Sequence, residues 1–352
     1  MSTPPAARDL FLGEILEQPD AIRSAADGLA RQGDALDRIA RRVVEGAPLV
    51  LTGMGSSFDA VLGLASVLGR AGIPAVCATA AELLHFRLAA IRPGSLVLVV
   101  SQSGLSAEAV RLAQALDARG DVTIASVTNG LENGLAPIAD VAIDMSAGAE
   151  VGPSTKTFVA TLVVLAAIAG RLGSGGDGVE LVDRARRAAE RMATALTRAE
   201  QRGAELEDWW GGRPTLVFVG RGAGLAAAEL AALVVKEAAH VGAFALESAE
   251  FRHGPMEMAG PDLAVAIIDV EPATSHLEAG LADDLRRAGA AVLTVGAADS
   301  AVAPSRDGLV GDPLLDAAIA TAPLLLLCWR LSTRRGDAPG QFRVGTKTTT
   351  KE

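Results

Sequence analysis

Short apolar runs alternate with longer stretches of helical periodicity along most of the chain. In the first half, five runs have the length and composition of strands: 48–52, 75–78, 96–100, 122–128 and 139–144. The run 96–100, Leu-Val-Leu-Val-Val, contains no polar residue, which is typical of a strand buried on both faces. Helical patterns separate these runs. Alternating strands and helices predict a parallel, doubly wound sheet.

The second half of the chain repeats this plan. Strands are expected at 215–219, 264–269 and 291–295, with apolar helices at 226–241 and 313–331. The predicted fold class is therefore α/β, with two doubly wound parallel sheets in tandem, each in a three-layer α/β/α arrangement. The expected divisions are an N-terminal helical segment (1–47), a first domain (48–172), a linker and bridging helix (173–212), a second domain (213–335) and a tail (336–352).

Composition and charge narrow the class of protein. The 352 residues are 50% hydrophobic and carry a formal net charge of −10, which argues against a general nucleic-acid binder. Cys77 and Cys328 stand in apolar surroundings and are expected to be core residues, and the four histidines show no metal-ligand spacing. There is no signal-peptide pattern, and the apolar runs at 158–170 and 317–329 look too short or too interrupted to cross a membrane. We expect a cytoplasmic protein with no metal.

The turn that follows the run 96–100 is the first candidate for chemistry. Ser101, Gln102, Ser103 and Ser106 crowd it, around Gly104, before a helical pattern begins. A helix N-terminus exposes unpaired N–H groups and favours anions, so the turn could cradle a phosphate. It could equally be an ordinary serine-rich helix cap. A similar Gly/Ser turn at 53–57 follows the strand at 48–52, whereas the turn at 220–224 lacks the spacing of a dinucleotide fingerprint.

Several segments, taken in order, resemble the sugar isomerase (SIS) superfamily, and most closely the isomerase half of glutamine:fructose-6-phosphate amidotransferase. The resemblance covers nearly the whole chain and implies the SIS fold for both predicted domains. The segments that carry it are Glu14 to Pro19, Gly55 to Ser57, Ser101 to Gly104, Glu150 to Gly152, Ser154 to Lys156, Lys236-Glu237, Glu250 to Pro255 and Thr346 to Thr348.

The resemblance also implies roles for three residues. Glu237 would move a proton between C1 and C2 of the sugar, although on its own it reads as a surface glutamate beside Lys236. His253 would open the sugar ring from the partner subunit, which implies a homodimer with shared active sites. Lys347 would form a Schiff base with the sugar carbonyl, although on its own it reads as a solvated lysine of the tail. Glu250 is expected to be structural.

The remaining residues implied by the resemblance bind the substrate. No metal or redox cofactor is required, and neither nucleic acid nor a membrane is expected as a partner. Ser154 would hold a sugar hydroxyl. The phosphate would be held by Ser56, Ser57, Ser101, Gln102, Ser103 and Ser106.

Departures from the synthase affect the expected reaction. The glutaminase domain and its cysteine nucleophile are missing from this sequence, so we expect no ammonia to be made from glutamine within it. Val234 stands where the synthase has a lysine, and the tail 340–344 differs from the family's usual sequence. The expected function is an aminosugar-6-phosphate deaminase that forms fructose 6-phosphate and ammonia. Alternatives are a fructosamine-6-phosphate deglycase, a synthase-like aminotransferase without a glutaminase, and a non-catalytic sugar-phosphate sensor.

Overall fold

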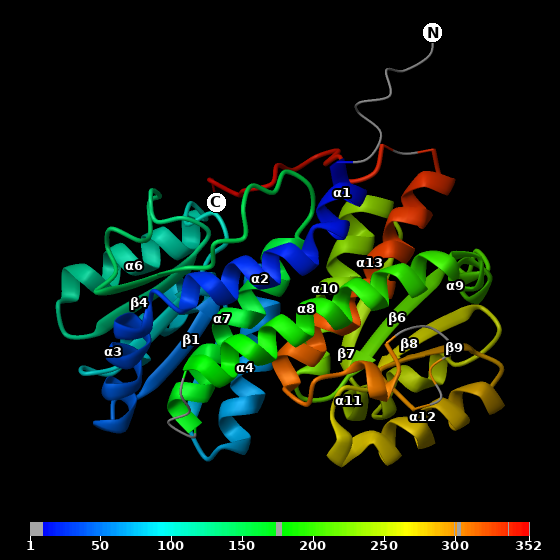
Figure 1. Ribbon diagram of the computed structural model, residues 1–352, viewed down its shortest axis with the longest axis horizontal. Coiled ribbons are helices and arrows are strands. Elements are labelled where there is room, and N and C mark those ends of the chain that lie inside the picture. Colours follow the sequence, from blue (N-terminus) through cyan, green and yellow to red (C-terminus); the bar gives the residue numbers. More distant parts are fainter. Residues whose placement is uncertain (1–9, 174–177, 299, 301–303, 337, 352) are drawn as a thin grey trace, which may run out of the picture. The chain divides into compact units, whose positions relative to one another are not determined.

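The computed structural model describes residues 10–173, 178–298, 300, 304–336 and 338–351. They form two compact units, each of which is described by itself (Figure 1). The N-terminal unit comprises residues 20–149, 157–173, 178–186 and 345–351 of the described chain. The C-terminal unit comprises residues 10–19, 150–156 and 187–344 of the described chain.

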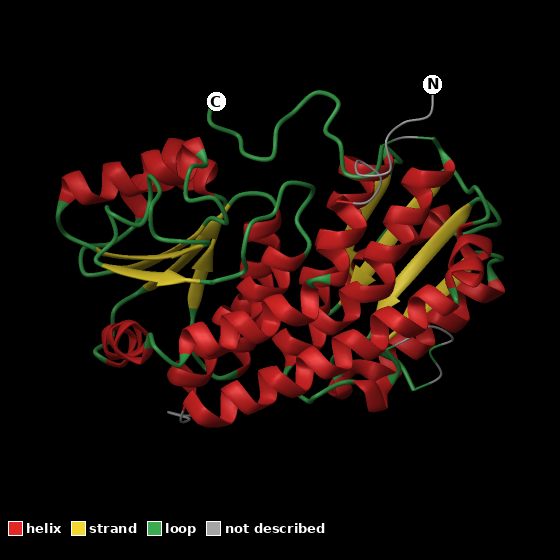
Figure 2. Ribbon diagram, turned by 45° about the horizontal axis from the view of Figure 1, so that its top comes forward, coloured by secondary structure: helices red, strands yellow, loops and turns green. Residues whose placement is uncertain are grey.

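The N-terminal unit is built on a parallel sheet with the strand order β2-β1-β3-β4-β5 (Figure 2). The chain leaves β1 to one side to form β2 and then crosses to the other side to form β3, so the strand order reverses between β1 and β3. Open α/β sheets bind ligands at such a switch point, outside the carboxyl ends of the strands. The strands are β1 (Leu49–Gly53), β2 (Ala75–Cys77), β3 (Leu96–Val100), β4 (Thr123–Thr128) and β5 (Val141–Asp144).

Both faces of this sheet are buried, as predicted for the run 96–100. Val97 and Val99 of β3 pack into a cluster with Leu112 and Leu116 of helix α6. The alternate residues of β3 point to the opposite face, and all five residues of the strand are buried. Figure 1 shows α3 and α6 on opposite sides of the sheet. The two apolar faces therefore fix the register that places the turns after β1 and β3 at the same edge.

The helices of the first half are more divided than the sequence indicated. The predicted N-terminal helical segment forms three helices in its described part, and the first break falls at Glu17, because Pro19 sits in the first turn of α2. The helical elements are α1 (Leu10–Leu16), α2 (Gln18–Leu29), α3 (Gly33–Val44), α4 (Ser56–Arg70), α5 (Ala80–Glu82), a π-helical turn η2 (Leu83–Arg87), η3 (Leu88–Ala90), α6 (Ala107–Arg119) and α7 (Lys156–Gly173).

The C-terminal unit contains a second parallel sheet, with the order β7-β6-β8-β9 and a switch point between β6 and β8. Its strands are β6 (Thr215–Gly220), β7 (Ala243–Glu247), β8 (Leu263–Ile268) and β9 (Ala291–Val295). Strand β7 was not predicted: its five residues follow a helix after a short connection and run directly into the next helix. It is an edge strand, and Phe244 on it is 57% exposed.

The helices of the C-terminal half also differ in detail from the prediction. The predicted helix 226–241 is α10 followed by a π-helical turn, and the bridging helix predicted within 173–212 is two helices. The elements are α8 (Gly178–Gln201), α9 (Gly203–Trp210), α10 (Gly224–Val234), η4 (Val235–Ala239), α11 (Ser248–Arg252), η5 (Pro255–Met258), η6 (Pro272–Thr274), α12 (Ser275–Arg287), η7 (Arg306–Gly308) and α13 (Pro313–Arg334).

Two helices, α7 and α13, are long and apolar enough by composition to span a membrane, with 18 and 22 residues. The expectation that these runs are too short is therefore wrong. Their apolar windows are 72% and 89% buried within the fold. Burial of that extent is typical of core helices, and α13 packs against α10 beside the second sheet.

Candidate functional site

The turns after β1 and β3 begin side by side at the first switch point. Gly53, the last residue of β1, is paired in register with Val100, the last residue of β3. The two strands approach so closely there that a Cβ atom on Gly53 would lie 2.9 Å from the carbonyl oxygen of Val100. Glycine at position 53 is therefore a packing requirement, and it brings the two serine-bearing turns together.

Hydroxyl groups connect and line these turns. The Ser57 hydroxyl accepts a hydrogen bond of 3.3 Å from the backbone N–H of Gln102, which joins the first turn to the second. The hydroxyl of Ser101 donates to that of Ser106 at 3.4 Å, and Ser103 accepts from the N–H of Leu105 at 3.1 Å. Ser57 and Ser101 are buried, while Ser103 and Ser106 remain partly exposed. The predicted binding residues after β1 and β3 therefore converge on one edge of the sheet.

These serines do not serve as ordinary helix caps in the structure. Ser106 occupies the N-cap position of α6, but its side chain makes no capping hydrogen bond, and Gly55 at the N-cap of α4 has no side chain to do so. The N-termini of two helices, each with partial positive charge, thus face the same edge as the hydroxyls. Such an arrangement suits a phosphate group, which accepts hydrogen bonds from both N–H and O–H donors.

Asn133 supports the second turn and was missed in the sequence. Gly104 has a positive φ of 62°, and a Cβ at this position would lie 2.2 Å from the side chain of Asn133. The Asn133 side chain accepts from the N–H groups of Leu135 and Ala136 and donates to the carbonyl of Gly130. The Asn129-Gly130 dipeptide is typical of a turn, and Asn133, which donates to the carbonyl of Gly130, lies against the back of the serine-bearing loop.

The C-terminal tail belongs to the same unit as these turns. The backbone N–H of Ala107, the first residue of α6, donates to the carbonyl of Thr349 at 3.0 Å. The Thr346 hydroxyl donates to the carbonyl of Thr348, which gives the tail a local turn around Lys347. Lys347 is partly buried. The structure thus places the predicted Schiff-base lysine in the segment attached to the helix that follows the serine turn.

Loop 150–156, which carries Ser154, is held by carboxylates in the C-terminal unit. The buried side chain of Glu14 accepts from the N–H groups of Val151 and Gly152, at 2.5 and 3.0 Å. Lys156 forms an ion pair with Glu17. Glu150 accepts from the N–H and hydroxyl of Thr155 at 2.9 and 3.0 Å. Ser154 is 8% exposed at the centre of this rigid loop.

Glu237 lies in the π-helical turn η4 that follows α10. Its neighbours Val234, Val235 and Ala238 are fully buried, while Glu237 itself is partly buried and Lys236 is exposed. Single π-helical turns occur frequently at functional sites, because the extra residue changes the direction of a side chain. The π-helical placement of Glu237 gave no signal in the sequence, and its role as a base stays a prediction.

His253 ends the short helix α11 and is exposed. Gly254 follows with a φ of 140°, and Pro255 then starts the next turn, so the backbone reverses directly after the histidine. The N–H of His253 donates to the carbonyl of Glu250, whose side chain is exposed. This geometry presents the imidazole to solvent or to another chain. Glu237, His253 and Ser154 belong to the C-terminal unit, and the serine turns and Lys347 to the N-terminal unit.

The second switch point has a different chemistry from the first. The turn after β6 contains Gly222, with a φ of 55°, and the N–H of Ala223 donates to the carboxylate of Glu271 at 3.2 Å. A Cβ on Gly222 would lie 2.5 Å from that carboxylate. At the second switch point the Glu271 carboxylate therefore lies next to the start of α10. The corresponding position after the strands of the first sheet carries serine hydroxyls instead.

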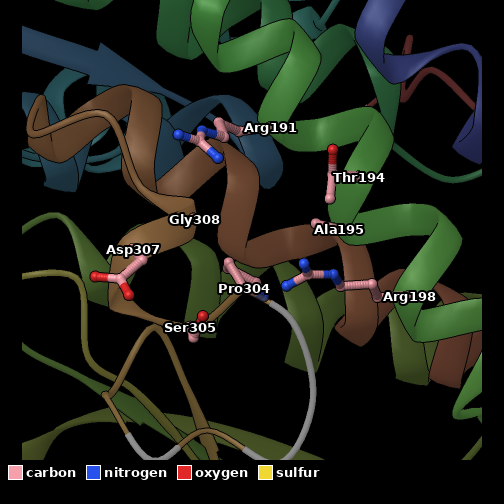
Figure 3. Close-up of a pocket in the computed structure, with 8 residues that line it drawn as sticks. All are labelled: Arg191, Thr194, Ala195, Arg198, Pro304, Ser305, Asp307 and Gly308. Carbon is pink, nitrogen blue, oxygen red and sulfur yellow. The ribbon is translucent and has the colours of Figure 1, made fainter.

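A small pocket of about 100 Å³ lies on α8 in the C-terminal unit. Figure 3 shows Arg198 directed from α8 toward Pro304, Arg191 at a separate position on the pocket wall, and the carboxylate of Asp307 turned away from both arginines. The space corresponds to roughly three water molecules at about 30 Å³ each. The pocket includes none of the predicted site residues.

The first sheet of the chain matches a known domain family. Residues 47–171 match the family model of the SIS domain. A glutamine--fructose-6-phosphate aminotransferase [isomerizing] from Aeropyrum pernix is 30% identical over 363 residues, which cover 97% of this chain and 57% of that relative. The chain thus spans less than two thirds of the length of that relative.

Solved structures establish the fold. The C-terminal domain of glucosamine-fructose-6-phosphate aminotransferase from Francisella tularensis matches 97% of this chain and 100% of its own, with a TM-score of 0.80 and 20% identity. Glucosamine-6-phosphate deaminase from Thermotoga maritima matches 97% of this chain and 99% of its own, with a TM-score of 0.76 and 20% identity. The family model covers the first sheet, and the assignment of the second sheet to a second SIS domain stays a prediction.

Proposed function

We propose that this chain, which carries a SIS domain and is homologous to the isomerase part of glutamine–fructose-6-phosphate aminotransferases, is an aminosugar-6-phosphate deaminase. It would convert glucosamine 6-phosphate and water into fructose 6-phosphate and ammonia. The observation that carries the proposal is the pair of joined, hydroxyl-bearing turns at the first switch point, whose serines do not cap the helices behind them.

In this proposal the phosphate binds at those turns. Ser56, Ser57, Ser101, Ser103 and Ser106 supply hydroxyl donors, and Gln102 supplies its side-chain amide. Hydrogen bonds to a charged acceptor contribute about 1.5–3 kcal/mol each, so a few of them suffice for specific binding. The phosphate then fixes one end of the sugar, and Ser154 would hold a hydroxyl along its chain.

The chemistry starts with opening of the sugar ring, for which His253 transfers a proton at the ring oxygen. Glu237 then removes the proton from C2 of the open-chain aldehyde and returns a proton to C1. Together with a proton that passes from the C2 amine to the C1 oxygen, this transfer turns the C1 aldehyde into an alcohol and the C2 amine into an imine. One carboxylate serves both carbons in this step.

Lys347 would complete the release of nitrogen. Its amine adds to the C2 imine, the C–N bond to the original nitrogen breaks, and ammonia leaves. Water then hydrolyses the lysine imine, which yields fructose 6-phosphate and restores the free amine. The exposed position of His253 fits a homodimer in which the histidine serves the site of the partner subunit, and we propose such a cytoplasmic homodimer.

The direct experiment incubates the purified chain with glucosamine 6-phosphate and measures ammonia and fructose 6-phosphate. We expect equal amounts of both products, and their loss in Glu237→Gln, which keeps the shape of the side chain but cannot accept the proton. Glu257→Gln changes an exposed glutamate of the same unit and should retain the activity. Normal turnover by Glu237→Gln would reject the assignment of the base.

The reverse reaction, in which an amine is transferred to fructose 6-phosphate, is a second candidate function. The 30% identity to an aminotransferase favours it. Supplying fructose 6-phosphate with ammonium and measuring glucosamine 6-phosphate tests it directly. Release of free lysine from a fructoselysine phosphate would instead indicate a deglycase. Tight binding of all three sugar phosphates without turnover of any would indicate a sensor and would overturn the enzymatic proposal.

A further inference from the structure

A second cavity in the C-terminal unit lies beside the carboxyl ends of β8 and β9. It has a volume of about 260 Å³, room for roughly nine waters at about 30 Å³ each. Asp269 follows β8 directly, Thr294 belongs to β9, and Ser275 and Glu278 lie on α12. The cavity is separate from the residues of the proposed reaction, and it occupies the edge of the sheet where α/β proteins bind ligands.

The walls of the cavity contain a buried acceptor that lacks a partner. Asp269 is 3% exposed, and its Oδ2 atom receives the hydroxyl of Ser275 at 2.5 Å and the guanidinium of Arg306 at 2.7 Å. Its Oδ1 atom has no hydrogen-bond partner in the described part of the chain. Leaving a buried carboxylate oxygen unsatisfied costs about 1–3 kcal/mol or more, so a donor is expected in the cavity.

Glu278 is the second buried carboxylate on the wall, also 3% exposed. Its Oε1 atom accepts from Arg221 at 3.0 Å, whereas Oε2, next to the Ser248 hydroxyl, makes no well-formed hydrogen bond within the described ranges. Burial raises the pKa of Glu278 to about 7, and the charges of Asp269 and Glu247 oppose its ionisation further. The wall is thus rich in negative charge that its own cations do not fully balance.

The charged groups around the cavity carry a net negative charge. The carboxylates Asp269, Glu278 and Asp283 line it, and Glu247 lies close enough to act on Glu278. Three guanidinium groups accompany these four carboxylates in the described contacts, those of Arg221, Arg306 and Arg286. The excess is negative, so a cation is attracted and an anion is repelled.

We propose that this cavity binds a small organic ammonium compound, whose N–H groups donate to the free oxygens of Asp269 and Glu278. Charge-assisted hydrogen bonds to carboxylates are the strong class, and a primary ammonium group offers three donors. A bare metal ion fits less well, because the cavity is much larger than an ion and the described residues contain no group of three side chains suited to hold one. Hydroxyl groups of the same compound would fit Thr294 and Ser275.

The experiment titrates the full-length chain with ethanolamine, and with glycerol as an uncharged probe of similar size, by isothermal titration calorimetry. We expect one ethanolamine per chain, bound about tenfold or more tightly than glycerol. Ala279→Leu places bulk on an exposed position that lines the cavity without disturbing any ion pair, and it should abolish binding. Ala288→Leu adds the same bulk at the exposed end of the same helix, outside the cavity, and should bind as the wild type does.

Asp269→Asn tests the acceptor directly and should weaken ethanolamine binding about tenfold or more. Because this change also disturbs Arg306, Ala279→Leu remains the decisive variant where Asp269→Asn does not fold. Binding should tighten as the pH rises from 6 to 8, since Glu278 must ionise against Asp269 and Glu247, with Arg221 and Ser248 in support. Equal binding of glycerol and ethanolamine, binding that survives Ala279→Leu, or no binding at all would overturn the proposal. None of these results depends on sugar-phosphate turnover.

Discussion

The backbone N–H of Ala107 donates a hydrogen bond of 3.0 Å to the carbonyl oxygen of Thr349. Ala107 is the first residue of α6, so its N–H is one of those left without a partner inside the helix. The C-terminal tail satisfies this group and is thereby attached at the end of the serine turn. The proposed imine-forming residue, Lys347, is two positions away along the tail, which ties its placement to the integrity of that turn.

This attachment makes the role of Lys347 testable by chemical trapping. Incubation with fructose 6-phosphate and borohydride should reduce the imine and add the sugar phosphate covalently to Lys347, which mass spectrometry of peptides would locate. Lys347→Arg keeps the positive charge but removes the amine, so we expect the label to disappear. Lys351→Arg alters an exposed lysine of the same tail and should leave labelling unchanged. Equal labelling of the Lys347→Arg protein would contradict the assignment.

The phosphate-binding role of the serine turn predicts a specific loss of affinity. Ser103→Ala removes one hydroxyl donor to a charged group, worth about 1.5–3 kcal/mol, and should weaken binding of fructose 6-phosphate about tenfold or more. Calorimetry with the sugar phosphate and with unphosphorylated fructose provides the measurement. Ser24→Ala, at an exposed serine of α2 in the same unit, is the matched control. A similar loss with both variants would show that the turn does not bind the phosphate.

Gly104 should be intolerant of any side chain. Alanine would need the positive φ of 62°, and its Cβ would overlap the side chain of Asn133, which holds the back of the turn. We expect Gly104→Ala to lower the free energy of unfolding by about 1–3 kcal/mol and to weaken phosphate binding. Gly69 lies inside α4, and a Cβ added there would have no atom within 4 Å, so Gly69→Ala should raise the free energy of unfolding by about 0.4–1 kcal/mol. Urea unfolding of both variants measures these two changes in the free energy of unfolding.

Strands whose signal is local were predictable from the sequence. The run 96–100 is apolar over its length, the run 291–295 is apolar except for Thr294, and the structure gives both the predicted bounds. Strand β7 was missed because it runs directly into α11 without a separating turn. The sequence favours a break at Asp20, after Pro19, but the break falls at Glu17 because Pro19 can start a helix as well as end one.

The residues of the candidate site likewise divide into those with a local signal in the sequence and those without one. The serines after β1 and β3 carry their own signal, because hydroxyl-rich turns after buried strands are unusual in composition. Contacts between residues far apart in the sequence carry no such signal. Glu14 accepts from the N–H of Val151, and Glu271 accepts from the N–H of Ala223 at the start of α10, only in the folded chain. The orphaned oxygen of Asp269 is likewise invisible in the sequence, since its neighbours come from separate elements.

Asp316 should make the stability of the protein depend on pH. It is buried near the start of α13, and burial raises its pKa from 3.8 to about 7, although the N–H groups of Val310 and Gly311 lower it. The carboxyl group is therefore protonated in the folded chain at pH values where it is already ionised in the unfolded chain. Stability falls as the pH rises from about 4 to 7, at up to about 1.4 kcal/mol per pH unit, and is level above that range.

Asp316→Asn removes this ionisation and should flatten the pH dependence. Between pH 5 and pH 7 the wild type should lose about 2–3 kcal/mol of unfolding free energy more than the variant does, because the asparagine has no proton to lose. The variant still weakens the hydrogen bonds to Val310 and Gly311, but that cost is the same at every pH and does not enter the slope. Asp262→Asn, at an exposed position of the same unit, should keep the wild-type slope. Parallel urea-unfolding profiles for the wild type and Asp316→Asn across this range would show that the buried carboxyl group is not the source.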